Sequence, residues 1–277
     1  MRLIQAKDHR VSPLNVSCHA AIVNATTGNA LGDLKTCIRC RTTNGGIVKQ
    51  LEVPPRLGEI LAKAHEPQRG FSWNAASWKA ALGDCPAVLT QLDALPHSVN
   101  RDEVCKVVTT NLARRSVLPA FVTAMVWGYG TAGYGPARVR WVLTGIRGRG
   151  TYGAPIRPDV AERLEAAVQV VRDLGAVEGF RHMNNAGHIK YLGPAFFTKW
   201  LYFSSAASGP DDAKAAPILD KQVKDWLANN AAVRLNINKT VEYGRYVELL
   251  TAWGSQAPTT RTPVQVEKAI FHLATGR

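Results

Sequence analysis

The sequence predicts a mainly α-helical protein with a small antiparallel β-sheet at its N-terminus. Beyond Pro55, apolar residues recur at helical spacing, whereas residues 1–55 carry β-branched, alternating stretches separated by turn pairs. Hydrophobic residues make up 46% of the chain and charged residues 20%, which is typical of a protein with a folded core. We therefore expect a small β region over 1–55 and a helical domain over 56–277.

The N-terminal region is expected to hold two or three antiparallel strands. The candidates are residues 19–23, 36–41 and 47–53, with turn pairs between them. A sheet this small needs a surface to pack on, so we expect it to be an appendage of the helical domain.

The helical domain is expected to contain nine helices, of which Pro158–Leu174 is the clearest and the first two are short candidates. In chain order they are Asn74–Leu82, Arg101–Leu112, Val117–Val126, Pro136–Leu143, Pro158–Leu174, Pro194–Ser205, Asp220–Ala228, Thr240–Trp253 and Pro263–Ala274. The third is apolar nearly all round, which predicts a buried helix. Between the helices we expect a glycine-aromatic loop over 127–136 and an exposed basic loop over 145–158.

The charge of the chain indicates a polyanionic partner. The formal net charge is +13 and the sequence pI is about 9.8. The basic residues are spread along the chain and are not gathered beside an apolar anchor, which favours nucleic acid over a membrane surface. No apolar run is long enough to span a bilayer and the first residues lack a secretion signal, so we expect a cytoplasmic monomer that binds duplex DNA.

Two segments carry the candidate chemistry. In the first, a short hairpin ends at Gly193, and Pro194 opens an apolar helix whose free N–H groups could bind an anion such as a DNA phosphate. In the second, Asp220 stands where the N-cap of a helix belongs, with Val223 and Leu227 on the apolar stripe behind it. Taken alone, each segment has a purely structural interpretation, as an ordinary helix start and an ordinary cap.

Together these segments resemble the helix-hairpin-helix superfamily of DNA glycosylases. Residues 217–223, with the sequence PILDKQV, are similar to the segment around the catalytic aspartate in its adenine-mismatch branch. Residues 189–202 resemble its hairpin and following helix, over about 180–206. A small sheet before the helices is similar to the 8-oxoguanine branch. The resemblance implies that Asp220 is the catalytic carboxylate and that Lys190, Leu192, Gly193 and Ala195 hold a DNA phosphate.

The departures from the family pattern bear on the mechanism. Tyr191 stands at the first glycine of the hairpin, and Ala195 stands where members that also cleave the strand carry a lysine. We therefore expect a monofunctional glycosylase, in which Asp220 and water remove a damaged or modified base flipped out of the duplex. Lys199, one turn after Ala195, is the alternative amine nucleophile; its structural interpretation is a snorkelling surface lysine.

Other residues are expected to bind the backbone or the base. Further phosphate contacts are assigned to Arg147, Arg149 and Lys221. The candidates for a base pocket or a wedge into the duplex are Trp127, Tyr129, Tyr134, Phe196 and Phe271, with Tyr243 as a further pocket residue. Trp127 could equally close the core while the nearby glycines make turns.

No cofactor is expected. Cys37 and Cys40 have metal-ligand spacing and Cys18 precedes them, but no second pair of this kind exists, so reduced cysteines are favoured over zinc. The resemblance allows a monovalent cation at the hairpin. The alternative to an enzyme is a non-catalytic DNA-binding relative, in which Asp220 only caps its helix. The sequence does not identify the base, and it leaves open base excision repair or defence against modified foreign DNA.

Overall fold

The computed structural model describes residues 52–63 and 68–276. The described residues all belong to one compact unit of the chain, Val48–Arg277. The strands predicted before residue 52, and Cys18, Cys37 and Cys40, lie outside the described residues.

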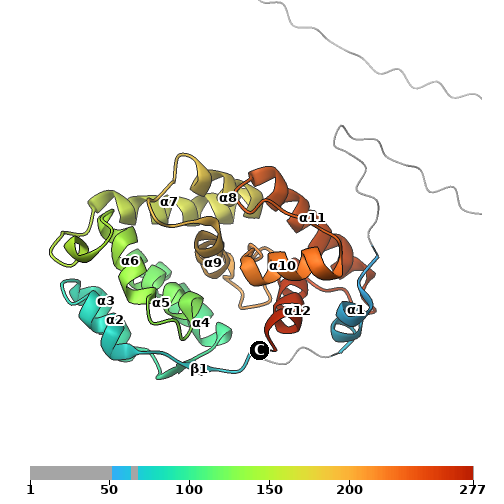
Figure 1. Cartoon of the computed structure of the whole chain (residues 1–277), viewed down its shortest axis with the longest axis horizontal. Helices are drawn as coiled ribbons and strands as arrows, with labels where there is room; N and C mark the ends of the chain where they lie inside the picture. Colours follow the sequence, from blue (N-terminus) through green and yellow to red (C-terminus); the bar gives the residue numbers. More distant parts are fainter. Residues whose placement is uncertain (1–51, 64–67, 277) are drawn as a thin grey trace, which may run out of the picture. The chain divides into compact units, whose positions relative to one another are not determined.

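The described part of the chain is mainly helical, as the sequence predicts (Figure 1). The helices are α1 (Pro55–Leu61), α2 (Ala75–Ala81), α3 (Pro86–Ala94), α4 (Arg101–Ala113), α5 (Val117–Tyr129), α6 (Gly135–Thr144), α7 (Pro158–Leu174), α8 (Ala176–Asn184), α9 (Pro194–Ser205), α10 (Lys221–Asn230), α11 (Thr240–Gln256) and α12 (Pro263–Thr275), with a 3-10 turn at Arg149–Thr151. The strands β1 (Phe71–Ser72) and β2 (Ser98–Val99) form an antiparallel pair.

The nine expected helices are all present, and the ends of the clearest agree. Helix α7 spans Pro158–Leu174 and ends at Gly175, whose φ of 87° is a conformation that glycine adopts without strain. Helices α1, α3 and α8 are absent from the sequence prediction. The first two are too short to display an apolar period, and Gly175 alone separates α8 from α7. The strands β1 and β2 are also absent from it.

The glycine-aromatic loop is shorter than predicted. Helix α5 continues through Tyr129 and α6 begins at Gly135, so only residues 130–134 connect the two helices. Trp127 and Gly128 are therefore part of a helix. The basic segment after α6 is a loop, as expected, with a single 3-10 turn.

Helix α9 lies among four other helices and is almost completely buried. It contacts α4, α5, α7 and α8, and every residue from Phe197 to Ser205 is buried (Figure 1). Trp200 meets the edge of Phe121 on α5, with the ring centroids 5.7 Å apart. Helix α5 is buried from Pro119 to Trp127, which confirms the prediction of a buried helix there. A polar side chain on α9 must therefore find a partner inside the protein.

A buried ion pair joins α4 to α12. The guanidinium of Arg101 donates two hydrogen bonds to Glu267, at 2.7 and 3.1 Å. The same guanidinium lies over the rings of Trp127 and Tyr202, 5.0 and 4.8 Å from their centroids. The two side chains are 2% and 0% exposed, so this pair is closed to solvent.

Candidate active site

Asp220 is the N-cap of α10, as the sequence predicts. Its backbone is extended, and its Oδ1 atom accepts hydrogen bonds from the N–H groups of Gln222 at 3.0 Å and Val223 at 3.2 Å. The residue is only 9% exposed. Capping accounts for one carboxylate oxygen, and the other oxygen points to a different partner.

That partner is Lys199 on α9. The ammonium Nζ of Lys199 donates to Oδ2 of Asp220 at 2.8 Å and to the carbonyl oxygen of Ala195 at 3.1 Å. Lys199 is 6% exposed, so the interpretation of it as a snorkelling surface lysine is wrong. The turn of α9 brings its amine back over the position of Ala195, where a lysine stands in family members that also cleave the strand.

The surroundings of Asp220 keep it ionised. Burial raises the pKa of its carboxyl, but the charge and hydrogen bond of Lys199 and the two backbone N–H groups lower it. Together the stabilising contacts prevail and leave the pKa below its usual value of 3.8. The site therefore holds a carboxylate at neutral pH in a place that is largely closed to water.

A glycine on α5 makes room for Lys199. A Cβ atom at Gly128 would lie 2.9 Å from Cδ of Lys199, closer than such contacts normally come. The ring of Phe196 lies on another side of the lysine, with its centroid 5.2 Å from Nζ. In the sequence, the only signal for this contact is a glycine inside an apolar helix, and Gly128 was instead assigned to a loop.

The predicted hairpin connects α8 to α9 through residues 185–193. Tyr191 has a φ of 70°, the left-handed conformation that glycine adopts most easily, which explains why the family pattern has glycine there. Gly193 is exposed, and a Cβ atom on it would meet nothing within 4 Å. No side chain caps α9. Pro194 has no N–H group and the N–H of Phe196 donates to the carbonyl of Gly193, which leaves the N–H of Ala195 for an anion.

The predicted hairpin residues differ in what they offer to DNA. Lys190 and Gly193 are exposed and Ala195 is half-buried at the start of α9. The side chain of Leu192 is buried, and its N–H donates to the carbonyl of Ile189, so its expected role in phosphate contact needs correction. Leu192 anchors the turn from inside.

Arg163 on α7 braces this turn. Its NH1 group donates to the carbonyls of Ala186 at 2.9 Å and His188 at 3.1 Å, and its Nε donates to Asp159. These two carbonyls already accept from a cationic group. A monovalent cation elsewhere in the hairpin stays a prediction.

A cluster of aromatic and basic residues connects the hairpin to the basic loop. The rings of Trp141 on α6 and Tyr191 are 6.1 Å apart. The guanidinium groups of Arg138 and Arg147 lie 4.8 and 5.5 Å from the centre of Trp141, and Nζ of Lys190 lies 5.0 Å from that of Tyr191. We call these five residues the basic-aromatic surface. The sequence singled out Lys190 and Arg147, but not Trp141 or Arg138.

Two other predicted phosphate-binding residues lie outside this cluster. Arg149 is exposed in the 3-10 turn of the basic loop. Lys221, at the start of α10, is also exposed and pairs with Asp225 one turn later. Their contact with DNA stays a prediction.

Three of the predicted pocket or wedge residues form one stack. The rings of Tyr129 and Phe196 stack with centroids 4.1 Å apart, and Tyr134 meets the edge of Tyr129 at 5.9 Å. Tyr134 is 62% exposed, whereas Phe196 lies against Lys199. These three rings thus extend from the protein surface at Tyr134 to the ion pair between Lys199 and Asp220.

Three other aromatic residues take structural positions. Trp127 is buried, meets the edge of Phe203 and donates from its indole N–H to Gln68, so it closes the core and would have to leave it to act as a wedge. Tyr243 is fully buried and does not face a base pocket. Phe271 on α12 packs against the core, and its place in a pocket stays a prediction.

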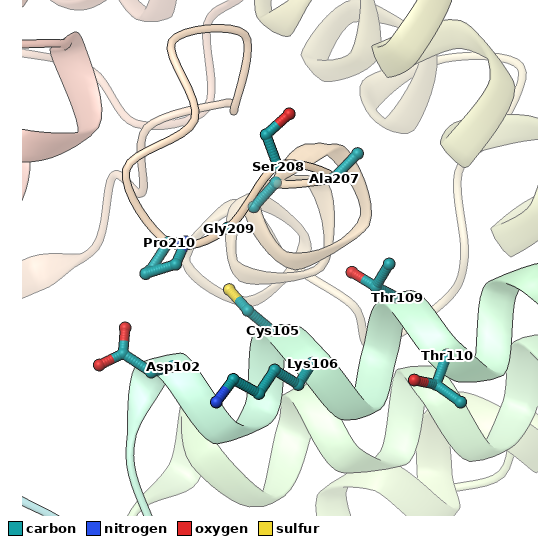
Figure 2. Close-up of a pocket in the computed structure, with 10 residues that line it drawn as sticks. Asp102, Cys105, Lys106, Thr109, Thr110, Ala207, Ser208, Gly209 and Pro210 are labelled. Atoms are coloured by element: carbon teal, nitrogen blue, oxygen red, sulfur yellow. The ribbon is translucent and has the colours of Figure 1, made fainter.

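A groove of about 610 Å³ lies between α4 and residues 206–210 (Figure 2). Asp102, Cys105 and Lys106 approach it from α4, opposite Ser208 and Pro210. Neither Lys199 nor Asp220 lines it. Because its second wall is the segment that follows α9 and neither side chain of the ion pair reaches it, the groove is not the candidate active site.

Among the described residues, no three His, Cys, Asp or Glu side chains are grouped to hold a metal ion. The described cysteines, Cys85 and Cys105, are free thiols, and burial raises the pKa of Cys105 to about 11. Within the same residues, no helix is both long and apolar enough to cross a bilayer.

The described residues form a helical body with a hairpin between α8 and α9 and a buried carboxylate that caps a later helix, which is the arrangement that the resemblance to helix-hairpin-helix glycosylases predicts. The sequence profile of the family described as "Putative 8-oxoguanine DNA glycosylase OGG-like protein" matches residues 64–271. Because the match covers most of the chain, the chain belongs to this OGG-like family. The match also confirms the resemblance seen in the sequence. No curated protein and no solved structure matches the chain.

Proposed function

We propose that this protein is a DNA glycosylase that removes a damaged base from duplex DNA, with Asp220 as its catalytic carboxylate. The observation that carries the proposal is the ionised, nearly buried carboxylate that caps α10 beside the start of the hairpin helix α9. The family description makes 8-oxoguanine the first base to test. The biological role follows as base excision repair, with defence against modified foreign DNA as the second possibility.

In the hydrolytic mechanism, the target nucleotide leaves the stack at a cost on the order of a few kcal/mol. As the N-glycosidic bond breaks, the base leaves with the bonding electrons and positive charge grows on the deoxyribose. Asp220 stabilises that charge and orients the attacking water. The product is an intact abasic site, as expected for a monofunctional enzyme. This route is supported by the absence of an amine at Ala195.

The position of Lys199 supports a second mechanism. Its Nζ atom lies 2.8 Å from Asp220 and 3.1 Å from the carbonyl oxygen of Ala195, so an amine that has lost its proton to solvent would stand beside the carboxylate that stabilises the sugar. The neutral amine would then attack the sugar C1′ atom as the base leaves with the bonding electrons. The nitrogen would lose a proton, the ring oxygen O4′ would take one up as its bond to C1′ breaks, and a protonated imine would join Lys199 to the opened sugar. Borohydride reduces such an imine to a stable covalent complex, whereas the hydrolytic route gives none.

The basic-aromatic surface and the start of α9 are the proposed DNA interface. The exposed side chains of Arg138 and Lys190 lie against the rings of Trp141 and Tyr191, close to the uncapped start of α9. We assign a DNA phosphate to this place. Because phosphate contacts release counterions, affinity for duplex DNA is expected to fall steeply with salt. A shallow salt dependence would contradict an interface that follows the backbone.

The test is base release from duplexes that carry 8-oxoguanine and other damaged bases, followed by alkali to reveal abasic sites. Asp220→Asn should lower the rate on the order of a hundred- to a thousandfold while retaining DNA affinity. Asp225→Asn, on the exposed side of the same helix, is the matched control and should keep the rate. Full activity in Asp220→Asn would overturn the catalytic role of Asp220. DNA binding by the wild-type protein without any base release would favour the non-catalytic relative.

A further inference from the structure

The segment that leads into Asp220 is buried but belongs to no helix or strand. Residues 215–220 are all buried, and 216–219 connect the loop after α9 to the N-cap of α10. A buried irregular segment must satisfy its backbone polar groups with side chains, since regular secondary structure does not do so. The groups that bind this backbone therefore determine where the carboxylate lies.

Two tyrosines on α11 bind the carbonyls of this segment. The hydroxyl of Tyr243 donates to the carbonyl oxygen of Pro217, and the hydroxyl of Tyr246 donates to that of Ile218, each at 2.7 Å. The next residue, Leu219, donates its N–H to the hydroxyl of Thr198 on α9 at 3.3 Å. Three consecutive residues before Asp220 are thus held by side chains from two helices.

The tyrosines also connect Asp220 to the hairpin. The ring of Tyr243 stacks on Phe180 of α8, with centroids 4.3 Å apart, and Phe180 meets the edge of Phe197 on α9 at 4.9 Å. Helices α8 and α9 flank the hairpin that is proposed to hold the DNA phosphate. The carboxylate is therefore placed relative to the same two helices that place the DNA backbone.

The environment keeps both hydroxyls as donors. Tyr243 and Tyr246 are fully buried, and burial raises the pKa of each phenol above its ordinary value, so neither loses its proton near neutral pH. The centroids of their rings are 6.0 Å apart, and this packing restricts the rotation of both rings. The hydrogen bonds to Pro217 and Ile218 therefore do not depend on pH near neutrality.

We propose that Tyr243 and Tyr246 are positioning residues, which fix Asp220 against the cationic sugar of the reacting nucleotide by holding the carbonyls of Pro217 and Ile218. The inference rests on the proposed function of Asp220 and adds a role to residues that touch neither DNA nor base. Loss of the hydroxyls leaves two buried carbonyls without a donor, so the segment shifts to find new partners. A shift of this kind weakens interactions that exist only in the transition state.

A probe that does not depend on the identity of the base can test this. It is a duplex in which one nucleotide is a pyrrolidine abasic-site analogue, whose ring nitrogen is positively charged like the reacting sugar. The reference is the same duplex with a neutral tetrahydrofuran abasic site. We define the charge preference as the ratio of the affinities for these two duplexes; it measures how well the carboxylate faces the cation.

The variants are Tyr243→Phe, Tyr246→Phe and their combination. Tyr202→Phe is the matched control, because its buried hydroxyl donates to the carbonyl of Pro210 at 2.8 Å, in a loop that does not contain the carboxylate. We expect the double variant to lower the charge preference roughly tenfold, with unchanged affinity for the neutral duplex. The control should keep the full preference. If the double variant fails to fold, the single variants are compared at temperatures where they remain folded.

The outcomes separate the two proposals. Loss of the charge preference in Asp220→Asn but full retention in folded tyrosine variants would show that the hydroxyls only stabilise the fold, and would overturn the positioning role. Retention of the preference in Asp220→Asn, or its absence in the wild-type protein, would instead overturn the proposed function of the carboxylate.

Discussion

Two buried ion pairs in this protein differ in how completely they are closed. Arg101 and Glu267 are joined by two hydrogen bonds, and their side chains are 2% and 0% exposed. The guanidinium of Arg101 also lies over two aromatic rings. Lys199 and Asp220 share a single hydrogen bond, and their side chains are 8% and 13% exposed. The first pair is closed to any further partner, whereas the side chains of the second pair remain partly accessible to another group.

The difference separates a structural ion pair from the pair that we propose acts on DNA. A fully closed pair can only connect helices, here α4 and α12. A partly open pair with one fixed carboxylate oxygen can exchange its ammonium for another cation, such as the reacting sugar. Burial alone therefore does not identify an active site. The more informative observation is a buried ionised group that another molecule can still reach.

The largest effect is expected when the closed pair is broken. Glu267→Gln leaves Arg101 buried without its counter-charge and should lower the free energy of unfolding by about 3–5 kcal/mol. Chemical denaturation measures this. The combination Arg101→Met with Glu267→Leu should recover much of the loss, since apolar residues replace such pairs well. Base release per folded molecule should stay near that of the wild type, and a selective loss would contradict the structural assignment.

Removal of Lys199 from the open pair should have a smaller effect on stability and a specific effect on pH dependence. Lys199→Met should lower the free energy of unfolding by roughly 1.5–3 kcal/mol, because Asp220 keeps its two backbone hydrogen bonds. In the wild type, the lowered pKa means that Asp220 stays ionised above 3.8 and loses its stabilising contacts only as the pH falls below that value.

In Lys199→Met, burial still raises the pKa of Asp220 but its largest opposing influence is gone, so the carboxyl takes up its proton at a higher pH. The charge preference for the pyrrolidine duplex, measured from neutral to acid pH, should therefore decline at a higher pH than in the wild type. Coincident pH profiles would show that Lys199 does not control the ionisation of Asp220.

Gly128→Ala tests the space around the open pair without removing a charge. The new Cβ atom would displace Cδ of Lys199, while alanine in a helix adds up to about 1 kcal/mol of stability. We expect slower base release without loss of stability. Gly244→Ala is the matched control, since that helical glycine has its nearest neighbour at 3.8 Å, and it should affect stability alone. Equal rates in both variants would mean that the place of Lys199 is unimportant.

The sequence predicted the features that depend on neighbouring residues. The ends of α7 follow from an apolar stripe, a proline and a glycine, and the cap of α10 follows from Asp220 and the stripe behind it. The contact between Lys199 and Asp220 joins residues 21 positions apart across a loop, so no local pattern contains it. With the path of α9 unknown, a lysine on an apolar helix was assigned to the surface.

The same limit applies to the residues that surround the site. Tyr243 was expected to face a base pocket because it is aromatic and lies near the C-terminus, but its hydroxyl binds the carbonyl of Pro217. Trp141 and Arg138 were not singled out, since their proximity to the hairpin depends on how α6 packs. Residue type indicated which side chains could act, and tertiary packing decided which of them meet.

The smallest effect is expected for an ion pair at the surface, which completes the comparison. Glu242 and Arg245 are one turn apart on α11, with their N and O atoms 2.9 Å apart, and their side chains are 17% and 60% exposed. Glu242→Gln should change the free energy of unfolding by no more than about 1 kcal/mol, because water already solvates the guanidinium. Raising the salt concentration should reduce even this difference, since exposed charges are screened, whereas the effects of Glu267→Gln and Lys199→Met should persist. Denaturation at low and high salt measures all three. If Glu242→Gln cost as much as Lys199→Met, the number of ion pairs rather than their burial would govern stability, and the distinction between closed, open and exposed pairs would have no energetic basis.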